Sequence, residues 1–181
     1  SCCILRDRPI AQSPAPAPTP PATPKDLLPR AKSWGYQLTG LDVGRLAASP
    51  YDVLVIDYSR DGSEAEALKP ADLERLKRKP DGGRRVVLSY LSIGEAEDYR
   101  YYWNASWESW YFVPNFWSKP SWLGPVNGDW GGNYAVRYWE PDWQNIILGE
   151  GAYLDRIVRA GFDGVWLDKV DSSLEDIASG N

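Results

Sequence analysis

Apolar residues recur along the chain in two alternating patterns, short continuous runs and longer stretches with helical spacing. The clearest run lies within Tyr51–Tyr58, as expected of a parallel strand that is buried on both faces. Four more segments favour strands, so that five are predicted in all; these segments are Trp34–Leu38, Arg85–Leu91, Asn133–Tyr138 and Gly164–Asp168.

Helical spacing fills the intervals between these strands. A helix is predicted to begin near Pro70 and to end at the turn Pro80–Gly83. A second helical pattern covers Pro141–Val158, with an irregularity at Gly149 and Gly151, and Gly161 stands where a helix C-cap is expected.

The order of strands and helices indicates parallel strands joined by right-handed crossovers. An open doubly wound sheet and a (β/α)8 TIM-type barrel both fit this order. No Gly-rich turn follows the first strand, so the dinucleotide-binding form of the open sheet has no support. Five strands are fewer than a complete barrel contains, and such a barrel needs roughly 200 residues or more. We therefore expect an α/β fold with an incomplete TIM-type barrel.

Composition divides the chain into two parts, a processed N-terminus with a Pro-rich linker over residues 1–30 and a barrel portion over residues 31–181. Residues 9–29 hold eight prolines, which favours an extended spacer, although a tail without a spacing role fits equally. Ser1 and Cys2 fit what remains around a lipoprotein cleavage site, or they are ordinary residues. A lipid on Cys2 would be the one expected membrane attachment, at an extracellular or cell-surface location.

Charge and residue types exclude several function classes. The net charge of −5 and the pI near 4.8 argue against nucleic acid or an anionic membrane as a partner. The chain has no histidine, which excludes Ser-His-Asp catalysis and imidazole metal sites. Its two cysteines are the adjacent Cys2 and Cys3, so no zinc motif is present. We expect no cofactor and no metal, and proton transfer by carboxylates, tyrosine or lysine.

Aromatic residues are concentrated between Tyr99 and Trp143, which hold sixteen of the 24 in the chain. This segment follows the third predicted strand, so in a barrel it lies over the C-terminal face where active sites form. Tryptophan rings stack on the apolar faces of sugars, and the Gly-rich segment Gly128–Gly132 favours presentation of Trp130. The alternative is that these aromatics pack the loop onto itself and onto the barrel rim.

Three acids stand at or just past the ends of predicted strands, namely Asp57, Glu95 and Asp168. Parallel strands bring such ends to one rim, so we expect the three carboxylates around one cleft. Each also has a structural explanation. Asp57 could accept hydrogen bonds from nearby amides, Glu95 could begin a helix, and Asp168 could pair with Lys169 or Arg156.

Paired carboxylates suit the hydrolysis of glycosidic bonds. They lie about 5 Å apart in retaining enzymes and roughly 6.5 to 9.5 Å apart in inverting enzymes. An acid-lined, Trp-rich cleft without histidine fits this chemistry, and the sequence leaves the stereochemical outcome open.

Three segments resemble the signature blocks of glycoside hydrolase family 114, the endo-α-1,4-polygalactosaminidases and their bacterial and archaeal relatives. These segments are Ser89–Arg100, Asn133–Trp139 and Gly161–Asp171, within a similarity that runs from Trp34 to Asp171. The resemblance implies a TIM-type barrel, secretion, and hydrolysis of α-1,4-linked galactosamine polymers.

The resemblance also implies roles for individual residues. Asp168 is expected to be the catalytic nucleophile, with Glu95 and Asp57 as further catalytic candidates. The family's acid/base glutamate lies on a later strand, beyond Asn181, which leaves Glu95 as the fallback partner. The expected substrate-binding residues are Tyr90, Glu97, Arg100, Trp130, Tyr138, Trp139 and Asp171.

Two other functions remain open. The chain could be a Trp-lined carbohydrate-binding domain without turnover, or a scaffold whose aromatics form an oligomer interface. The exact sugar and the oligomeric state are not determined by the sequence.

Overall fold

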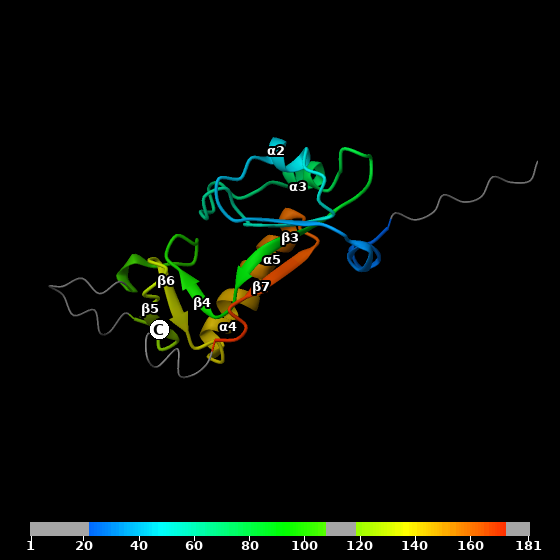
Figure 1. The fold of residues 1–181 in the computed structure, drawn as a ribbon. Coiled ribbons are helices and arrows are strands. Elements are labelled where there is room, and N and C mark those ends of the chain that lie inside the picture. The colour runs from blue at the N-terminus through cyan, green and yellow to red at the C-terminus, as the bar shows by residue number, and fades with distance from the viewer. Residues whose placement is uncertain (1–21, 108–118, 173–181) are drawn as a thin grey trace, which may run out of the picture.

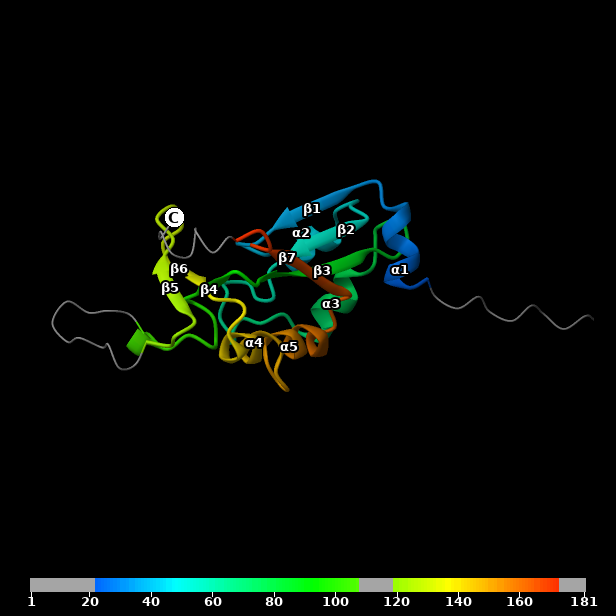
Figure 2. The same ribbon diagram turned by 90° about the horizontal axis from the view of Figure 1, so that it is seen from below.

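A four-stranded parallel sheet forms the centre of the computed structural model, which describes residues 22–107 and 119–172. Its strand order is β1 (Trp34–Gln37), β2 (Val53–Ile56), β3 (Val86–Ser92) and β7 (Gly164–Asp168). All three neighbouring pairs are parallel, and Figure 2 shows the four strands side by side. The α/β fold is therefore confirmed, and each of these strands lies within a predicted one, except that β3 extends one residue further, to Ser92.

Helices precede the first strand and lie in the connections between later ones. The helical elements are α1 (Pro24–Leu27), η1 (Leu28–Arg30), α2 (Val43–Ala47), α3 (Pro70–Leu76), η2 (Ala105–Trp107), α4 (Pro141–Leu148) and α5 (Tyr153–Ala160). Pro70 occupies the first turn of α3, and the Lys69 amide donates a hydrogen bond of 3.1 Å to Asp72 Oδ2. No helix in the described ranges is long and apolar enough to cross a bilayer.

The helical pattern over residues 141–158 forms two helices, which are divided at the predicted irregularity. Helix α4 ends at Leu148, and at Gly149 an added Cβ would lie 2.5 Å from the carbonyl oxygen of Asn145. Helix α5 begins at Tyr153 and ends at Gly161, whose left-handed φ of 101° confirms the predicted C-cap.

The two faces of the parallel sheet pack against different parts of the chain. One face, with Leu54, Ile56 and Val87, belongs to the main core, to which helices α2, α3, α4 and α5 contribute side chains. The other face, with Val53, Val55 and Val86, packs against Leu27 and Ala31 at the ends of α1 and η1. In Figure 2, α1 lies at the end of the sheet where the strands begin. Residues 24–30, in the segment expected to be a linker, thus form helical turns.

The parallel sheet curves around the face that carries Val53. Strands β1 and β7 are its two opposite edges, yet the rings of Trp34 and Trp166 stack with centroids 5.8 Å apart and planes 15° apart. Side chains from two edges meet in this way only when the sheet bends toward that face, as strands do in a barrel.

A second, antiparallel sheet lies beyond the carboxyl ends of the parallel strands (Figure 1). Its order is β4 (Glu95–Glu97), β6 (Asn133–Val136) and β5 (Leu123–Val126). The prediction that Asn133–Tyr138 is a barrel strand was wrong, because β6 pairs antiparallel with β4. A short apolar run does not reveal which strand it will pair with. The described residues therefore contain four strands of a barrel.

Most aromatics of the segment 99–143 that the structure describes pack against one another. Trp143 lies at the centre, with ring centroids 4.9 Å from Trp122 and 5.7 Å from Tyr102, and its Nε1 donates a 2.9 Å hydrogen bond to the Ile93 carbonyl. The packing alternative is thus confirmed for these rings. Trp110 and Trp117, like Cys2, lie outside the described residues.

Candidate active site

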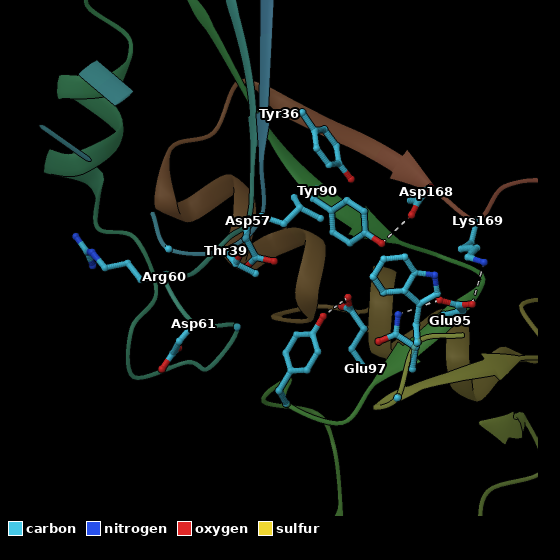
Figure 3. Close-up of a pocket in the computed structure, with 17 residues that line it drawn as sticks. Tyr36, Thr39, Asp57, Arg60, Asp61, Tyr90, Glu95, Glu97, Asp168 and Lys169 are labelled. Atoms are coloured by element: carbon cyan, nitrogen blue, oxygen red, sulfur yellow. Dashed lines mark hydrogen bonds and ion pairs between the residues drawn. The ribbon is translucent and has the colours of Figure 1, made fainter. Parts of the chain in front are cut away.

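The carboxyl ends of the parallel strands open into a cavity of about 830 Å³. Figure 3 shows its lining, in which the side chains used below are Tyr36, Asp57, Tyr90, Glu95, Glu97, Trp130, Asp168 and Lys169. The predicted convergence of strand-end carboxylates is present, since Asp57, Glu95 and Asp168 all line this cavity. In barrel enzymes this end of the strands carries the chemistry.

Asp168 ends β7 and is held by its neighbour on β3. Tyr90 lies opposite Trp166 in the strand register, and its hydroxyl donates a 2.8 Å hydrogen bond to Asp168 Oδ2. Burial, together with the charge of Glu97, raises the pKa of Tyr90, which therefore remains a neutral donor. Oδ1 of Asp168 has no hydrogen-bond partner in the part of the chain that the structure describes.

The suggested ion pairs of Asp168 are absent from the described structure. Lys169 pairs with Glu95 at 3.1 Å, and Arg156 pairs with Glu64 at 2.8 Å. Asp168 is therefore free of a bound cation within the described ranges.

Arg100 forms a buried bridge between two other carboxylates. Its Nη1 and Nη2 donate to the two oxygens of Asp57 at 2.8 and 2.7 Å, and its Nε donates to Glu97 Oε2 at 2.5 Å. Burial alone would lower the pKa of Arg100, but the hydrogen bonds to Asp57 and the negative charges of Glu97 and Asp57 together raise it. The second oxygen of Glu97 accepts from Tyr99, so all four carboxylate oxygens have donors.

Asp57 fits both of its predicted interpretations. It accepts a 2.9 Å hydrogen bond from the Ser59 amide, and it also lines the cavity. Arg100 lies behind the lining and is 4% exposed, so it braces the wall of the cavity.

Glu95 begins strand β4, so the suggestion that it begins a helix was wrong. Its Oε1 accepts hydrogen bonds from Asn127 Nδ2 at 2.8 Å, and its Oε2 accepts from Asn133 Nδ2 at 3.1 Å. Lys169 completes this set, and its hydrogen bond to Glu95 raises the pKa of the lysine.

The expected substrate-binding residues are divided by the structure. Tyr90, Glu97 and Trp130 line the cavity with the three acids, and Trp130 is 67% exposed. By contrast, Tyr138 and Trp139 contact each other edge to face at 5.1 Å and lie outside the cavity lining. Asp171 is also exposed and does not line it.

Sequence reasoning missed several lining residues, among them Tyr36, Asn133 and Lys169. Tyr36 could have been found, because it stands near the carboxyl end of the predicted strand Trp34–Leu38, and such ends meet at one rim. The position of Asn133 depends on the antiparallel pairing of β6, which the sequence did not indicate.

A metal site has no support in residues 22–107 and 119–172. They contain no group of three or more acidic, cysteine or histidine side chains that could hold a metal ion. The donors available in the cavity are instead suited to proton transfer and to binding hydroxyl or amino groups.

Comparison with known proteins gives a consistent family. The profile of glycoside-hydrolase family GH114 matches residues 11–180. An uncharacterised protein of Methanocaldococcus jannaschii is 44% identical over 138 residues, which cover 76% of this chain and 36% of that protein. An uncharacterised protein of Deinococcus radiodurans is 36% identical over 184 residues, covering 95% of this chain and 54% of that protein.

Two solved structures share the fold. Aspergillus fumigatus Ega3, in complex with galactosamine, has a TM-score of 0.56 at 21% identity, covering 82% of this chain and 48% of that one. The glycoside hydrolase domain of Pseudomonas aeruginosa PelA has a TM-score of 0.52 at 18% identity, covering 83% and 51%. The chain thus spans between about a third and a little over half of the length of these proteins.

Proposed function

The chain belongs to glycoside-hydrolase family GH114, and we propose that it hydrolyses an α-1,4-linked, galactosamine-containing polysaccharide with carboxylates as the reacting groups. The observation that carries the proposal is the meeting of Asp57, Glu95 and Asp168 in one cavity at the carboxyl ends of a parallel sheet. Exposed Trp130 in the same lining offers a ring face to a sugar.

Asp168 is the proposed nucleophile or base. Its Oδ1 is unoccupied by any described group, and Tyr90 fixes the carboxylate through Oδ2. A nucleophile needs a free oxygen in a fixed orientation, because attack on the anomeric carbon requires alignment of the two reacting atoms.

Glu95 is the proposed proton-transfer partner within this chain. Asp57 and Glu97 are less suited to that role, because Arg100 binds both and is itself buried. We propose that Asp57 and Glu97 support the cavity wall and keep it anionic.

An anionic cavity favours a cationic sugar. Five acids line it, namely Asp57, Asp61, Glu95, Glu97 and Asp168, against the cations Arg60 and Lys169. Galactosamine carries an ammonium group at neutral pH, so its polymers complement this charge. The solved complex of Ega3 with galactosamine supports the same class of ligand.

The expected setting is extracellular or on the cell surface. In this proposal the Pro-rich residues 9–29 act as a spacer and Cys2 carries lipid. Mass spectrometry of native protein tests the anchor, and an unmodified Cys2 would exclude it.

The enzymatic proposal is tested by release of reducing ends from α-1,4-linked galactosamine polymer. Asp168→Asn keeps the size of the side chain but removes the negative charge, so activity should fall by at least about a hundredfold. Asp142→Asn, on the exposed face at the start of α4, is the matched control and should keep full activity. Equal activity of Asp168→Asn and the unmodified protein would refute the assignment.

A non-catalytic carbohydrate-binding domain is the second candidate. It is favoured by the fact that Arg100 and Lys169 already bind three of the five lining carboxylates, which leaves Asp168 and Asp61 without a cation among the described residues. This function predicts saturable binding of oligosaccharides by the unmodified protein with no reducing ends released.

A further inference from the structure

Lys169 has an unusual backbone conformation at the end of β7. Its φ is 57°, and it is the one non-glycine residue with positive φ in residues 22–107 and 119–172. Such a conformation is unfavourable for a residue with a side chain and persists where the surroundings impose it. Successive side chains of an extended strand point to opposite faces, whereas Asp168 and Lys169 both line the cavity. The left-handed backbone conformation of Lys169 allows the two neighbouring side chains to face the same cavity.

This backbone conformation brings the Lys169 ammonium to Glu95. The Nζ–Oε1 distance is 3.1 Å, and Figure 3 shows the pair on the side of the cavity next to Asp168. The other donors to Glu95 are the amides of Asn127 and Asn133, which are neutral. They orient the carboxylate and leave its charge to be balanced by a cation. Glu95 thus forms a prepared position for one ammonium group.

The cation at Glu95 can be exchanged, unlike the cation at the other carboxylates. The side chain of Lys169 is 37% exposed and ends a flexible four-carbon stem, whereas that of Arg100 is 1% exposed and is held by three hydrogen bonds. Arg60 also lines the cavity, but it pairs with Asp72 at 3.0 Å and points away from the acids in Figure 3. Lys169 is therefore the lining cation that a ligand can replace.

We propose that Glu95, Asn127 and Asn133 form a subsite for the protonated amino group of a sugar, and that Lys169 occupies this subsite until the sugar displaces it. The proposal rests on the proposed function, because galactosamine supplies such a group, and it assigns Glu95 to binding of the amino group in place of proton transfer. An N-acetylated sugar has no ammonium and cannot replace that of Lys169. The free amino sugar alone therefore competes with the lysine, and Glu95 is the group that discriminates between free and acetylated amino sugars.

The size of the effect follows from the strength of the pair. A partly exposed ion pair is worth roughly 0.2 to 1 kcal/mol. Lys169 is then paired with Glu95 for most of the time. The apparent affinity of Glu95 for another ammonium group equals the intrinsic affinity multiplied by the fraction of molecules in which Lys169 is not paired. Removal of the lysine amine should therefore raise the affinity for galactosamine about two- to sixfold.

The test compares Lys169→Met with the unmodified full chain by calorimetric titration with D-galactosamine and with N-acetylgalactosamine. Neither monosaccharide contains a glycosidic bond, so the measured affinity does not depend on glycoside hydrolysis. Arg60→Met is the control, because it removes one positive charge from the same cavity without touching Glu95. We expect a two- to sixfold gain in affinity for galactosamine in Lys169→Met and no gain in Arg60→Met. The affinity of Lys169→Met for N-acetylgalactosamine should be unchanged. Glu95→Gln should lose the preference for galactosamine over N-acetylgalactosamine.

Several results would overturn the subsite. They are weaker or unchanged galactosamine binding by Lys169→Met, an equal gain in Arg60→Met, an equal gain for the acetylated sugar, and no galactosamine binding by either protein. Lys169→Gly, which suits a φ of 57°, replaces Lys169→Met if the latter does not fold. Polymer cleavage that is lost in Asp168→Asn would still support the enzymatic proposal in each of these cases.

Discussion

Replacement of Arg100 by methionine tests whether the buried charge cluster holds the cavity wall together. The side chains of Arg100, Asp57 and Glu97 are 1%, 5% and 3% exposed. Methionine fills a similar volume but leaves two buried carboxylates without their cation. The variant therefore separates loss of charge from loss of packing.

The expected cost is large for a single substitution. Removing one member of a buried ion pair destabilises a protein by about 3 to 5 kcal/mol, because the remaining charge stays buried and unpaired. For a chain of this length this corresponds to a decrease in Tm of about 6 to 20 °C. The guanidinium also lies over the rings of Tyr99 and Tyr153, at 4.9 and 5.5 Å, and those contacts are lost as well.

Urea unfolding at pH 7 measures this cost. The triple variant Asp57→Asn, Glu97→Gln, Arg100→Met removes all three charges and should recover most of the stability. Arg45→Met, on the exposed surface of α2, is the control.

A loss of unfolding free energy below about 1 kcal/mol for Arg100→Met at pH 7 would refute a stabilising role of the buried ion pairs, since exposed ion pairs contribute as much. The same conclusion would follow if the triple variant were as unstable as the single one. Either result would mean that the cavity wall does not depend on the charges of this cluster.

Two further predictions concern the close packing around the cavity. Gly94→Ala should lower both stability and activity, because an added Cβ would clash with the carbonyl oxygen of Lys169. Gly128→Ala is the control, because the space around Gly128 is open. Equal thermal unfolding temperatures of the two variants would contradict the expectation. Stability should also fall as the pH rises above 10.0, the ordinary pKa of tyrosine. Burial raises the pKa of Tyr90 and Tyr153 in the folded chain. Above pH 10.0 the folded state therefore binds more protons than the unfolded state, and a further rise in pH favours unfolding. Absorbance of tyrosinate against pH checks this, and titration of every tyrosine near pH 10 in a chain that stays folded would exclude it.

Local patterns determined much of the fold in advance. The apolar run Val53–Ile56 forms a buried central strand, and Gly161 ends α5 in a left-handed conformation. Such features depend on residues that are close in sequence, so periodicity and turn chemistry are sufficient to predict them. The same holds for the placement of Asp57 and Asp168 at strand ends.

The partners of these residues depend on contacts between distant segments. Whether Asn133–Val136 joins the barrel or an antiparallel sheet is decided by its pairing with β4, which also brings Asn133 to Glu95. The sequence likewise contained Arg100, but its bond to Asp57 spans 43 residues and forms only after the chain has folded.

The sequence by itself thus determined the strand-end carboxylates, the absence of histidine chemistry and the family signature. Tertiary structure alone decided which carboxylates carry a cation. Arg100 is buried against Asp57 and Glu97, Lys169 turns back to Glu95, and Asp168 keeps one oxygen without a described partner. The physical reason is that a carboxylate's chemistry depends on its neighbours in space, whereas local spacing determines only where along a strand it stands.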